Sequence, residues 1–240
     1  MKRYLETPQL PAGRVSLLAM GACYINDYSP ILTSYGIEVL PIHGTAAVDP
    51  RLQGHADLLL LHLGGDSFWA AKGVSIHNKI SIQNYVNLFE NEAALNLCIL
   101  GKYWIGSDKH AAWQPEDLVK ISVKQRYSRC STCIVDERSI ITSDHGIAHA
   151  AGANGIDVLE ICPGHIRLDG FDSGFIGGAS FKIASDKLAF TGSLHHHPDE
   201  KRILQFLSEH GQDAVYLKDE PLRDIGSAVL IAEEIDFPLP

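Results

Sequence analysis

Short alternating or apolar runs recur along the chain, and each follows a glycine that closes a helix-like segment. The three clearest copies read GIEVLPI at 36–42, GIDVLEI at 155–161 and GQDAVYL at 211–217. Glycine just past the last turn is typical of a helix C-cap. The segments that we therefore expect to be helical are residues 29–35, 145–154 and 199–210.

A second pattern consists of two β-rich arms separated by a short polar turn. It occurs in IVDERSIITS from Ile134 and in IASDKLAFTG from Ile183, and both stretches predict a hairpin. Hairpin, helix, glycine and strand then form one repeating unit of ββαβ type.

The spacing of the repeats indicates a closed ring of such units. Gly155 and Gly211 lie one unit apart, whereas Gly36 lies about two units before Gly155, with room for a degenerate copy near LNLCILG. RVSLLAMG at 14–21 and SAVLIAEE at 227–234 can pair to complete one further unit. The sequence predicts a single α/β domain over residues 1–240, with its core at about 15–232.

Four stretches around the expected hairpins share small residues on both sides of one variable position. They read LGGDSFW, SRCSTCI, IGGASFK and DIGSAVL, with Asp66, Cys130, Ala179 and Gly226 at that position. Equivalent positions of a pseudo-symmetric ring meet at its axis, so we expect Asp66 and Cys130 to face each other. The alternative is that the paired glycines only allow the strands to pack closely.

Composition and charge narrow the function classes. The formal net charge is −9, whereas a nucleic-acid-binding protein would normally carry a basic stripe. No apolar run reaches membrane-spanning length. The five cysteines, an odd number, favour reduced thiols over a disulfide framework. We therefore expect a cytoplasmic protein that binds a small molecule and neither nucleic acid nor membrane.

Three short motifs resemble the guanidine-modifying, or pentein, superfamily, which includes deiminases, hydrolases and amidinotransferases. They are HAD at 55–57, GGD at 64–66 and CST at 130–132, and a further stretch, GFIGGASFKI, is similar to an uncharacterised bacterial branch of the superfamily. The resemblance covers roughly residues 15–232 and implies a pseudo-symmetric propeller of ββαβ blades.

The resemblance also implies a cysteine-dependent hydrolase or amidinotransferase that acts on a small guanidino or amidino compound. Cys130 would attack the electrophilic carbon, with Cys133 as the competing thiol, and His55 would protonate the departing amine. Asp66 and Asp57 would pair with the planar cation. No cofactor or metal is implied, and the chain could act as a homodimer.

A turn-rich segment at 162–170, CPGHIRLDG, is a candidate lid over the site. It carries Arg167, which could meet the carboxylate of an amino-acid-like substrate. The alternative is an ordinary solvated loop.

Two other functions stay open. HAD precedes GGD here, Cys130 lies mid-chain, and the C-terminal DIGSAVL has no cysteine, which favours a non-catalytic small-molecule-binding protein on the same fold. The third interpretation is a zinc-stabilised domain, because the spacing of Cys130, Cys133, His145 and His149 resembles a Cys2His2 site. The hairpin at Ile183 has no such cysteines, so the fold element does not need zinc.

Overall fold

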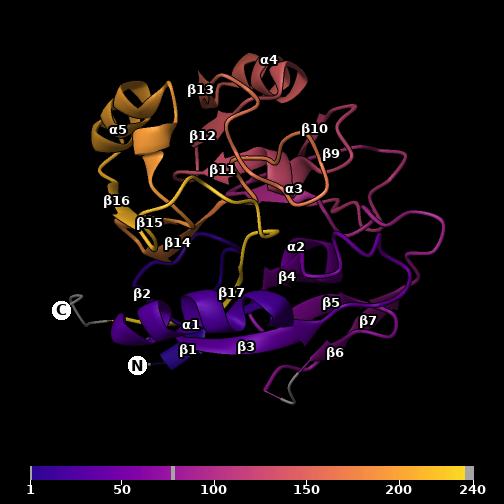
Figure 1. Ribbon diagram of the computed structural model, residues 1–240. Coiled ribbons are helices and arrows are strands. Elements are labelled where there is room, and N and C mark those ends of the chain that lie inside the picture. The colour runs from indigo at the N-terminus through magenta and orange to yellow at the C-terminus, as the bar shows by residue number, and fades with distance from the viewer. Residues whose placement is uncertain (1, 77–78, 236–240) are drawn as a thin grey trace.

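One pattern of strand pairing repeats five times within the described residues, which are 2–76 and 79–235 of the computed structural model (Figure 1). In each unit two strands pair antiparallel, and a third pairs parallel with the second. The five units are β17 (Val229–Glu234), β2 (Arg14–Gly21) and β3 (Glu38–His43); β4 (Leu60–Gly64), β5 (Ser67–Ala71) and β7 (Asn84–Val86); β8 (Cys98–Leu100), β9 (Tyr103–Gly106) and β10 (Val119–Ser122); β11 (Thr132–Ile134), β12 (Ser139–Thr142) and β13 (Asp157–Glu160); and β14 (Ser180–Ala184), β15 (Lys187–Phe190) and β16 (Asp213–Tyr216).

Three units carry a helix between their second and third strands, as the sequence predicts. These helices are α1 (Ile25–Ser34), α4 (His145–Ala153) and α5 (Glu200–Glu209). The glycines after them, Gly36, Gly155 and Gly211, have φ values of 73°, 77° and 64°. This is the left-handed region that a side chain adopts only with strain, so the C-cap prediction is confirmed.

The predicted spacing of about two units between Gly36 and Gly155 is wrong, because the strands that follow these glycines, β3 and β13, are three units apart, with β7 and β10 between them. Loops replace the helix in the units of β4 and β8, and the first of these loops contains the short β6 (Ser75–Ile76). Units without a helix are shorter, and they lack the helix–glycine signal from which the repeat was recognised.

The two ends of the chain complete one unit between them, as expected. β17 and β2 pair antiparallel with Leu230 opposite Leu18, and β1 (Lys2–Tyr4) adds to the outer side of β17. A single residue pair, Ala184 with Arg14, joins β14 to β2. The first and last parts of the sequence therefore depend on each other for their pairing.

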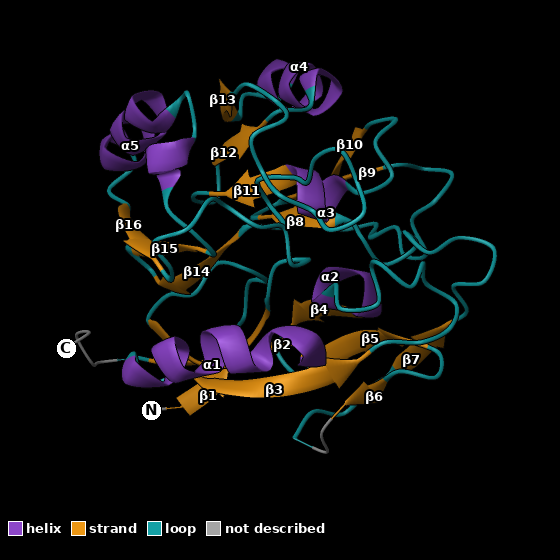
Figure 2. Cartoon of the chain, viewed as in Figure 1, coloured by secondary structure: helices purple, strands orange, loops and turns teal. Residues whose placement is uncertain are grey.

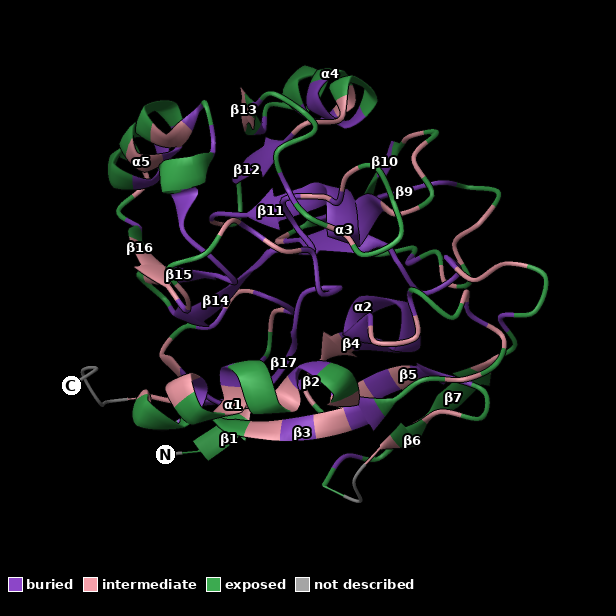
Figure 3. Cartoon of the chain, in the orientation of Figure 1, coloured by how far each residue is buried: buried purple, intermediate pink, exposed green. Residues whose placement is uncertain are grey.

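Long helices and short helices occupy different places in the fold. Figure 2 shows α1, α4 and α5 toward the outside, whereas α2 (Ala56–Leu59) and α3 (Ser128–Ser131) lie toward the middle. All residues of α2 and α3 are buried, whereas α4 and α5 each expose one face (Figure 3). No helix of the described residues is long and apolar enough to cross a membrane.

The pairing of β2 with β17 predicts a stability effect at Leu18. This side chain is 0% exposed on β2, so Leu18→Ala should lower the free energy of unfolding by about 2–5 kcal/mol. The matched control is Val119→Ala on β10, where the side chain is 46% exposed and the loss should stay within about 0.5 kcal/mol. Chemical denaturation measures both, and equal small losses would contradict a closing unit that folds cooperatively with the rest.

Candidate functional site

The segments that immediately precede the first strand of each unit meet in the middle of the molecule. We call them the leading segments: residues 55–59, 94–97, 128–131, 177–179 and 224–228. Backbone hydrogen bonds join them, from Asp57 N to Gly226 O (3.2 Å), from Gly178 N to Cys130 O (2.8 Å) and from Ser227 N to Gly178 O (2.8 Å). The Asn96 side chain joins the remaining segment, because its Oδ1 accepts from Arg129 N at 3.0 Å. Equivalent positions therefore converge, as the ring interpretation predicts.

Glycines allow this close approach. A Cβ at Gly177 would lie 2.3 Å from Thr132 O, and one at Gly178 would lie 1.9 Å from Asp224 Oδ1. Gly226 has a φ of 71°, and a Cβ there would lie 2.3 Å from the Cα of His55. For 177–178 the close-packing interpretation of the glycine pair is thus correct.

Cys130 sits at the centre of this junction with two polar partners. Its thiol donates to Asp57 Oδ2 at 2.7 Å, and its sulfur lies 3.3 Å from Asn96 Nδ2. Asn96 Oδ1 also accepts from the backbone N of Cys130 at 3.2 Å, which fixes the cysteine from a neighbouring unit. Cys130 is 3% exposed and Asp57 is 4% exposed, so the pair is shielded from water.

His55 and Asp224 complete the cluster beside Cys130. His55 Nδ1 lies 3.8 Å from Asp224 Oδ1, and both side chains are at most 2% exposed. Asp224 is held by two backbone donors, Phe175 N and Gly226 N, each at 2.9 Å from one carboxylate oxygen. His55 Nε2 is buried without a hydrogen-bond partner. A buried polar atom left unpaired is costly and is typical of a position that a ligand satisfies.

These three side chains line one cavity of about 190 Å³. The rest of its wall is largely apolar, formed by Leu52, Leu58, Tyr127, Leu168, Phe171, Ser173 and Phe175. A mostly apolar pocket with a few convergent polar groups is the usual form of a small-molecule site. Asp57 does not line this cavity and instead borders a second, smaller space.

The segment between β13 and β14 lines the cavity, but within the predicted lid at 162–170 only Leu168 is a lining residue, and most of that stretch is exposed. Leu168, Phe171 and Phe175 belong to the segment between β13 and β14 and line the wall. Arg51 holds the segment from outside, with its guanidinium 4.0 Å from the centre of the Phe171 ring and donating to Gly170 O at 2.8 Å. The contact leaves Phe171 partly exposed at the rim.

Burial and like charges keep the thiol protonated. Desolvation, followed by the charges of Asp57 and Asp224, raises the pKa of Cys130 well above its usual value. Desolvation also raises the pKa of Asp57 to about 6 and raises the pKa of Asp224, although His55 and Arg129 oppose both shifts. A cation bound here would reverse the balance, because it favours the ionised form of each acid.

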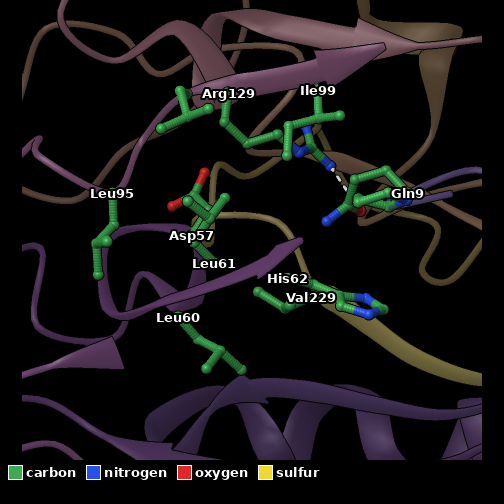
Figure 4. Close-up of a pocket in the computed structure, with 11 residues that line it drawn as sticks. Gln9, Asp57, Leu60, Leu61, His62, Leu95, Ile99, Arg129 and Val229 are labelled. Carbon is green, nitrogen blue, oxygen red and sulfur yellow. Dashed lines mark hydrogen bonds between the residues drawn. The ribbon is translucent and has the colours of Figure 1, made fainter. Parts of the chain in front are cut away.

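Arg129 lies on the other side of Asp57. Figure 4 shows its guanidinium directed at Gln9, with Asp57 at the edge of the same small space. This space is about 10 Å³, near the lower limit for a single water molecule. It is an internal void behind the site and is too small for a substrate.

The structure brings together His55, Asp57 and Cys130, and it leaves Asp66 and Arg167 outside. Asp66 is exposed in the turn between β4 and β5, because GGD forms that hairpin turn, with φ values of 105° and 56° at its two glycines. The expectation that Asp66 faces Cys130 is therefore wrong: Asp57 occupies that position. Arg167 pairs through its backbone with Leu222 and Asp224, but its side chain is exposed and does not line the cavity.

The cysteines and histidines of the zinc alternative do not converge. Cys133 packs into a hydrophobic cluster at 0% exposure, whereas His145 is exposed at the start of α4 with Nδ1 3.2 Å from Glu160. The structure also separates the two candidate thiols, because Cys130 lines the cavity and Cys133 does not.

Two members of the cluster were missed in the sequence. Asn96 stands in LNLCILG and Asp224 begins DIGSAVL, and both stretches had already been recognised as parts of units. The available signal was a polar residue just before an apolar first strand. The signal was missed because the unit of β4 was aligned on its hairpin turn, GGD, rather than on HADLLL.

Comparison with known families gives one match over most of the chain. Residues 25–229 match the family of unknown function (DUF6873). No curated protein matches the chain.

Solved structures of guanidino-modifying enzymes share the fold. An inosamine-phosphate amidinotransferase from Streptomyces griseus is similar with a TM-score of 0.57 and 9% identity, covering 99% of each chain. SxtG, an amidinotransferase from Microseira wollei in the saxitoxin biosynthetic pathway, gives 0.56 and 8%, covering 93% of this chain and 91% of that one. A substrate-bound agmatine deiminase variant from C. jejuni gives 0.50 and 8%, covering 91% of each. The predicted resemblance to the pentein superfamily is confirmed at the level of fold.

The raised pKa of Asp57 predicts how stability depends on pH. Its folded value of about 6 exceeds the ordinary 3.8, so its contribution to the free energy of unfolding is present below pH 3.8 and is lost as pH rises through 6. Asp57→Asn does not titrate, and it should stabilise the protein by roughly 1–3 kcal/mol at pH 7. The gain should vanish near pH 4.

Denaturation of both proteins at several pH values measures this difference, with Asp66→Asn at the exposed turn as the control that stays near zero. A gain for Asp57→Asn that does not depend on pH would show that ionisation of Asp57 is not its source.

Proposed function

Because the chain belongs to the family of unknown function (DUF6873) and shares its fold with two amidinotransferases and an agmatine deiminase, we propose that it is a cysteine-dependent enzyme acting on a small guanidino or amidino compound. The observation that carries the proposal is the convergence of Cys130, His55 and Asp224 on one buried cavity. The activities for which the comparison proteins are named support a guanidino or amidino compound as the class of substrate.

Binding of a cation supplies the activation that the resting thiol lacks. A guanidinium in the cavity pairs with Asp224, and its charge also offsets that of Asp57, which lies 2.7 Å from the sulfur. A pair of opposite unit charges at contact distance is worth about 4 kcal/mol at an effective dielectric constant of 20. The substrate itself therefore lowers the cost of forming the thiolate.

The reaction then needs one proton carrier. The thiol proton passes to His55, and the Cys130 sulfur forms a bond to the central carbon of the guanidinium. His55 returns the proton to the departing nitrogen as the carbon–nitrogen bond breaks, which leaves an amidino group on sulfur. Water or a second amine, deprotonated by His55, attacks that carbon and releases Cys130. Water gives the hydrolase reaction and an amine gives the amidinotransferase reaction.

The cavity wall favours a substrate with an apolar tail and no carboxylate. Its ionisable lining residues, among those described, are His55, Tyr127, Cys130 and Asp224, so none is a lysine or arginine. The exposed side chain of Arg167 does not supply the missing cation. An alkylguanidine therefore fits better than arginine. The sequence analysis instead expected an amino-acid-like substrate whose carboxylate would meet Arg167.

We also infer that the five units are the blades of a closed propeller. Their identical pairing pattern and the meeting of all five leading segments support this arrangement. The site would then lie at the axis, where each unit contributes through its leading segment.

A non-catalytic binding protein on the same fold is the second candidate. The specific observation in its favour is the pKa of Cys130, which burial and two carboxylates raise and so hold the thiol protonated. In that case the cavity binds the same cation, and no bond to sulfur forms.

Selective alkylation tests the cysteine assignment. Chloroacetamidine, which is cationic, should label Cys130 at least about tenfold faster at pH 6–7 than neutral chloroacetamide, because it is drawn to Asp224 and Asp57. An alkylguanidine should protect Cys130 at a lower concentration than arginine. Peptide mass mapping gives the rate at each thiol.

The exposed cysteines, Cys23 and Cys162, provide the internal control because neither lies in the cavity. They should react with both reagents at rates that differ little, and an alkylguanidine should not protect them. Equal, unprotected labelling of Cys130 by the two reagents would refute the nucleophile assignment.

A further inference from the structure

We propose that His55, Cys130 and Asp224 also form a binding site for a divalent transition ion of the zinc class, which closes the cavity to organic ligands. One potential ligand atom from each residue lies within 4.8 Å of the others, and all three residues are buried. Within the described part of the chain this is the one group of three or more such residues gathered closely enough to hold an ion.

The His55–Asp224 distance needs little adjustment for coordination, and the distances of both residues to Cys130 are at most 4.8 Å. Two ligands on a tetrahedral zinc ion, with bonds of about 2.0–2.3 Å, lie roughly 3.5 Å apart. The His55–Asp224 pair is already at 3.8 Å. His55 Nε2 has no hydrogen-bond partner, so the imidazole has a free nitrogen with which to adapt.

The donor set is suited to this class of ion. Thiolate, imidazole and carboxylate together are ligands that zinc takes in proteins, whereas magnesium and calcium prefer oxygen ligands alone. Three protein ligands leave a fourth position, and it would face the cavity that all three residues line. On binding, the ion replaces the thiol proton of Cys130, which passes to solvent.

The surrounding charges favour a cation in this place. Asp57 lies behind the sulfur and contributes a second carboxylate, and Arg129 is the one buried cation beside them. Asp224 is oriented by the backbone of Phe175 and Gly226, which gives the site a fixed ligand before the ion arrives. Such outer contacts hold first ligands in position.

This inference does not depend on the proposed catalysis, because the ion needs no substrate and no turnover. The two ideas are linked by competition for the same three side chains. A bound ion would occupy the position of the guanidinium and tie up the sulfur, so it acts as an inhibitor in an enzyme and as a competing ligand in a binding protein.

Cobalt(II), a spectroscopic substitute for zinc, tests the site directly. The experiment uses the full chain with Cys23→Ser and Cys162→Ser, which removes the exposed thiols that could bind metal elsewhere. Titration should give one cobalt per chain, with a thiolate-to-cobalt charge-transfer band that zinc abolishes. In the same protein, Cys130→Ser should remove the band, and Asp224→Asn should weaken cobalt binding at least tenfold.

Cys133→Ser is the matched control, since this thiol is buried in the core and should leave the band unchanged. Should Cys130→Ser fail to fold, protection of Cys130 from chloroacetamide by zinc in the parent protein gives the same information by mass mapping. A band that survives in folded Cys130→Ser, or alkylation of Cys130 that zinc does not slow, would overturn the proposal. Neither result bears on the protection of Cys130 by an alkylguanidine, which tests the proposed function separately.

Discussion

A single buried guanidinium, that of Arg129, ties the centre of the molecule together. It donates to Thr132 O at 3.0 Å, Gly177 O at 3.3 Å, Ser227 Oγ at 2.7 Å and Gln9 Oε1 at 3.4 Å, and the residue is 4% exposed. Because arginine stays charged in proteins, it must find acceptors when it is buried. Here the acceptors come from two leading segments (Gly177 and Ser227), from the start of β11 (Thr132) and from Gln9 in the N-terminal region. The small units, some without a helix, are held in register by this shared polar centre as well as by their apolar cores.

The same centre sets the charge of the site. Asp57 accepts from the Cys130 thiol at 2.7 Å, and the charge of Arg129 opposes the rise in the pKa of Asp57. Burial raises the pKa of both acids, and the resting site therefore keeps its sulfur protonated. A cationic ligand would favour ionisation. In the proposed reaction, a bound amidinium group therefore promotes the transfer of the thiol proton to His55.

Most of the repeating helices and strands could be predicted from the sequence, whereas the residues of the site could be predicted only in part. The helices at α1, α4 and α5 and their glycine caps follow from local patterns, and the pairing of β2 with β17 follows from the repeat, which needs both ends of the chain to complete one unit. The number of units did not follow from the sequence, because two of the units have loops where the helix would be.

His55, Asp57 and Cys130 were found from short motifs. Asp66 was placed at the axis in error, because paired glycines occur both in a hairpin turn and in a tightly packed leading segment. Their backbone conformations differ: Gly64 and Gly65 have φ values of 105° and 56°, as a hairpin turn needs, whereas Gly177 and Gly178 are not in that region and have no room for a Cβ.

The central claim is that Cys130 acts on the carbon of a bound guanidinium. The most direct measurement is the intact mass of the protein after incubation with an alkylguanidine and rapid acid quenching, followed by peptide mapping. The account predicts an added amidino group on Cys130 alone, which is absent in Cys130→Ser and does not form in His55→Ala, because His55 takes the thiol proton and protonates the departing nitrogen. Tight alkylguanidine binding with no adduct on Cys130 would contradict the account and identify the protein as a binding protein on an enzyme fold.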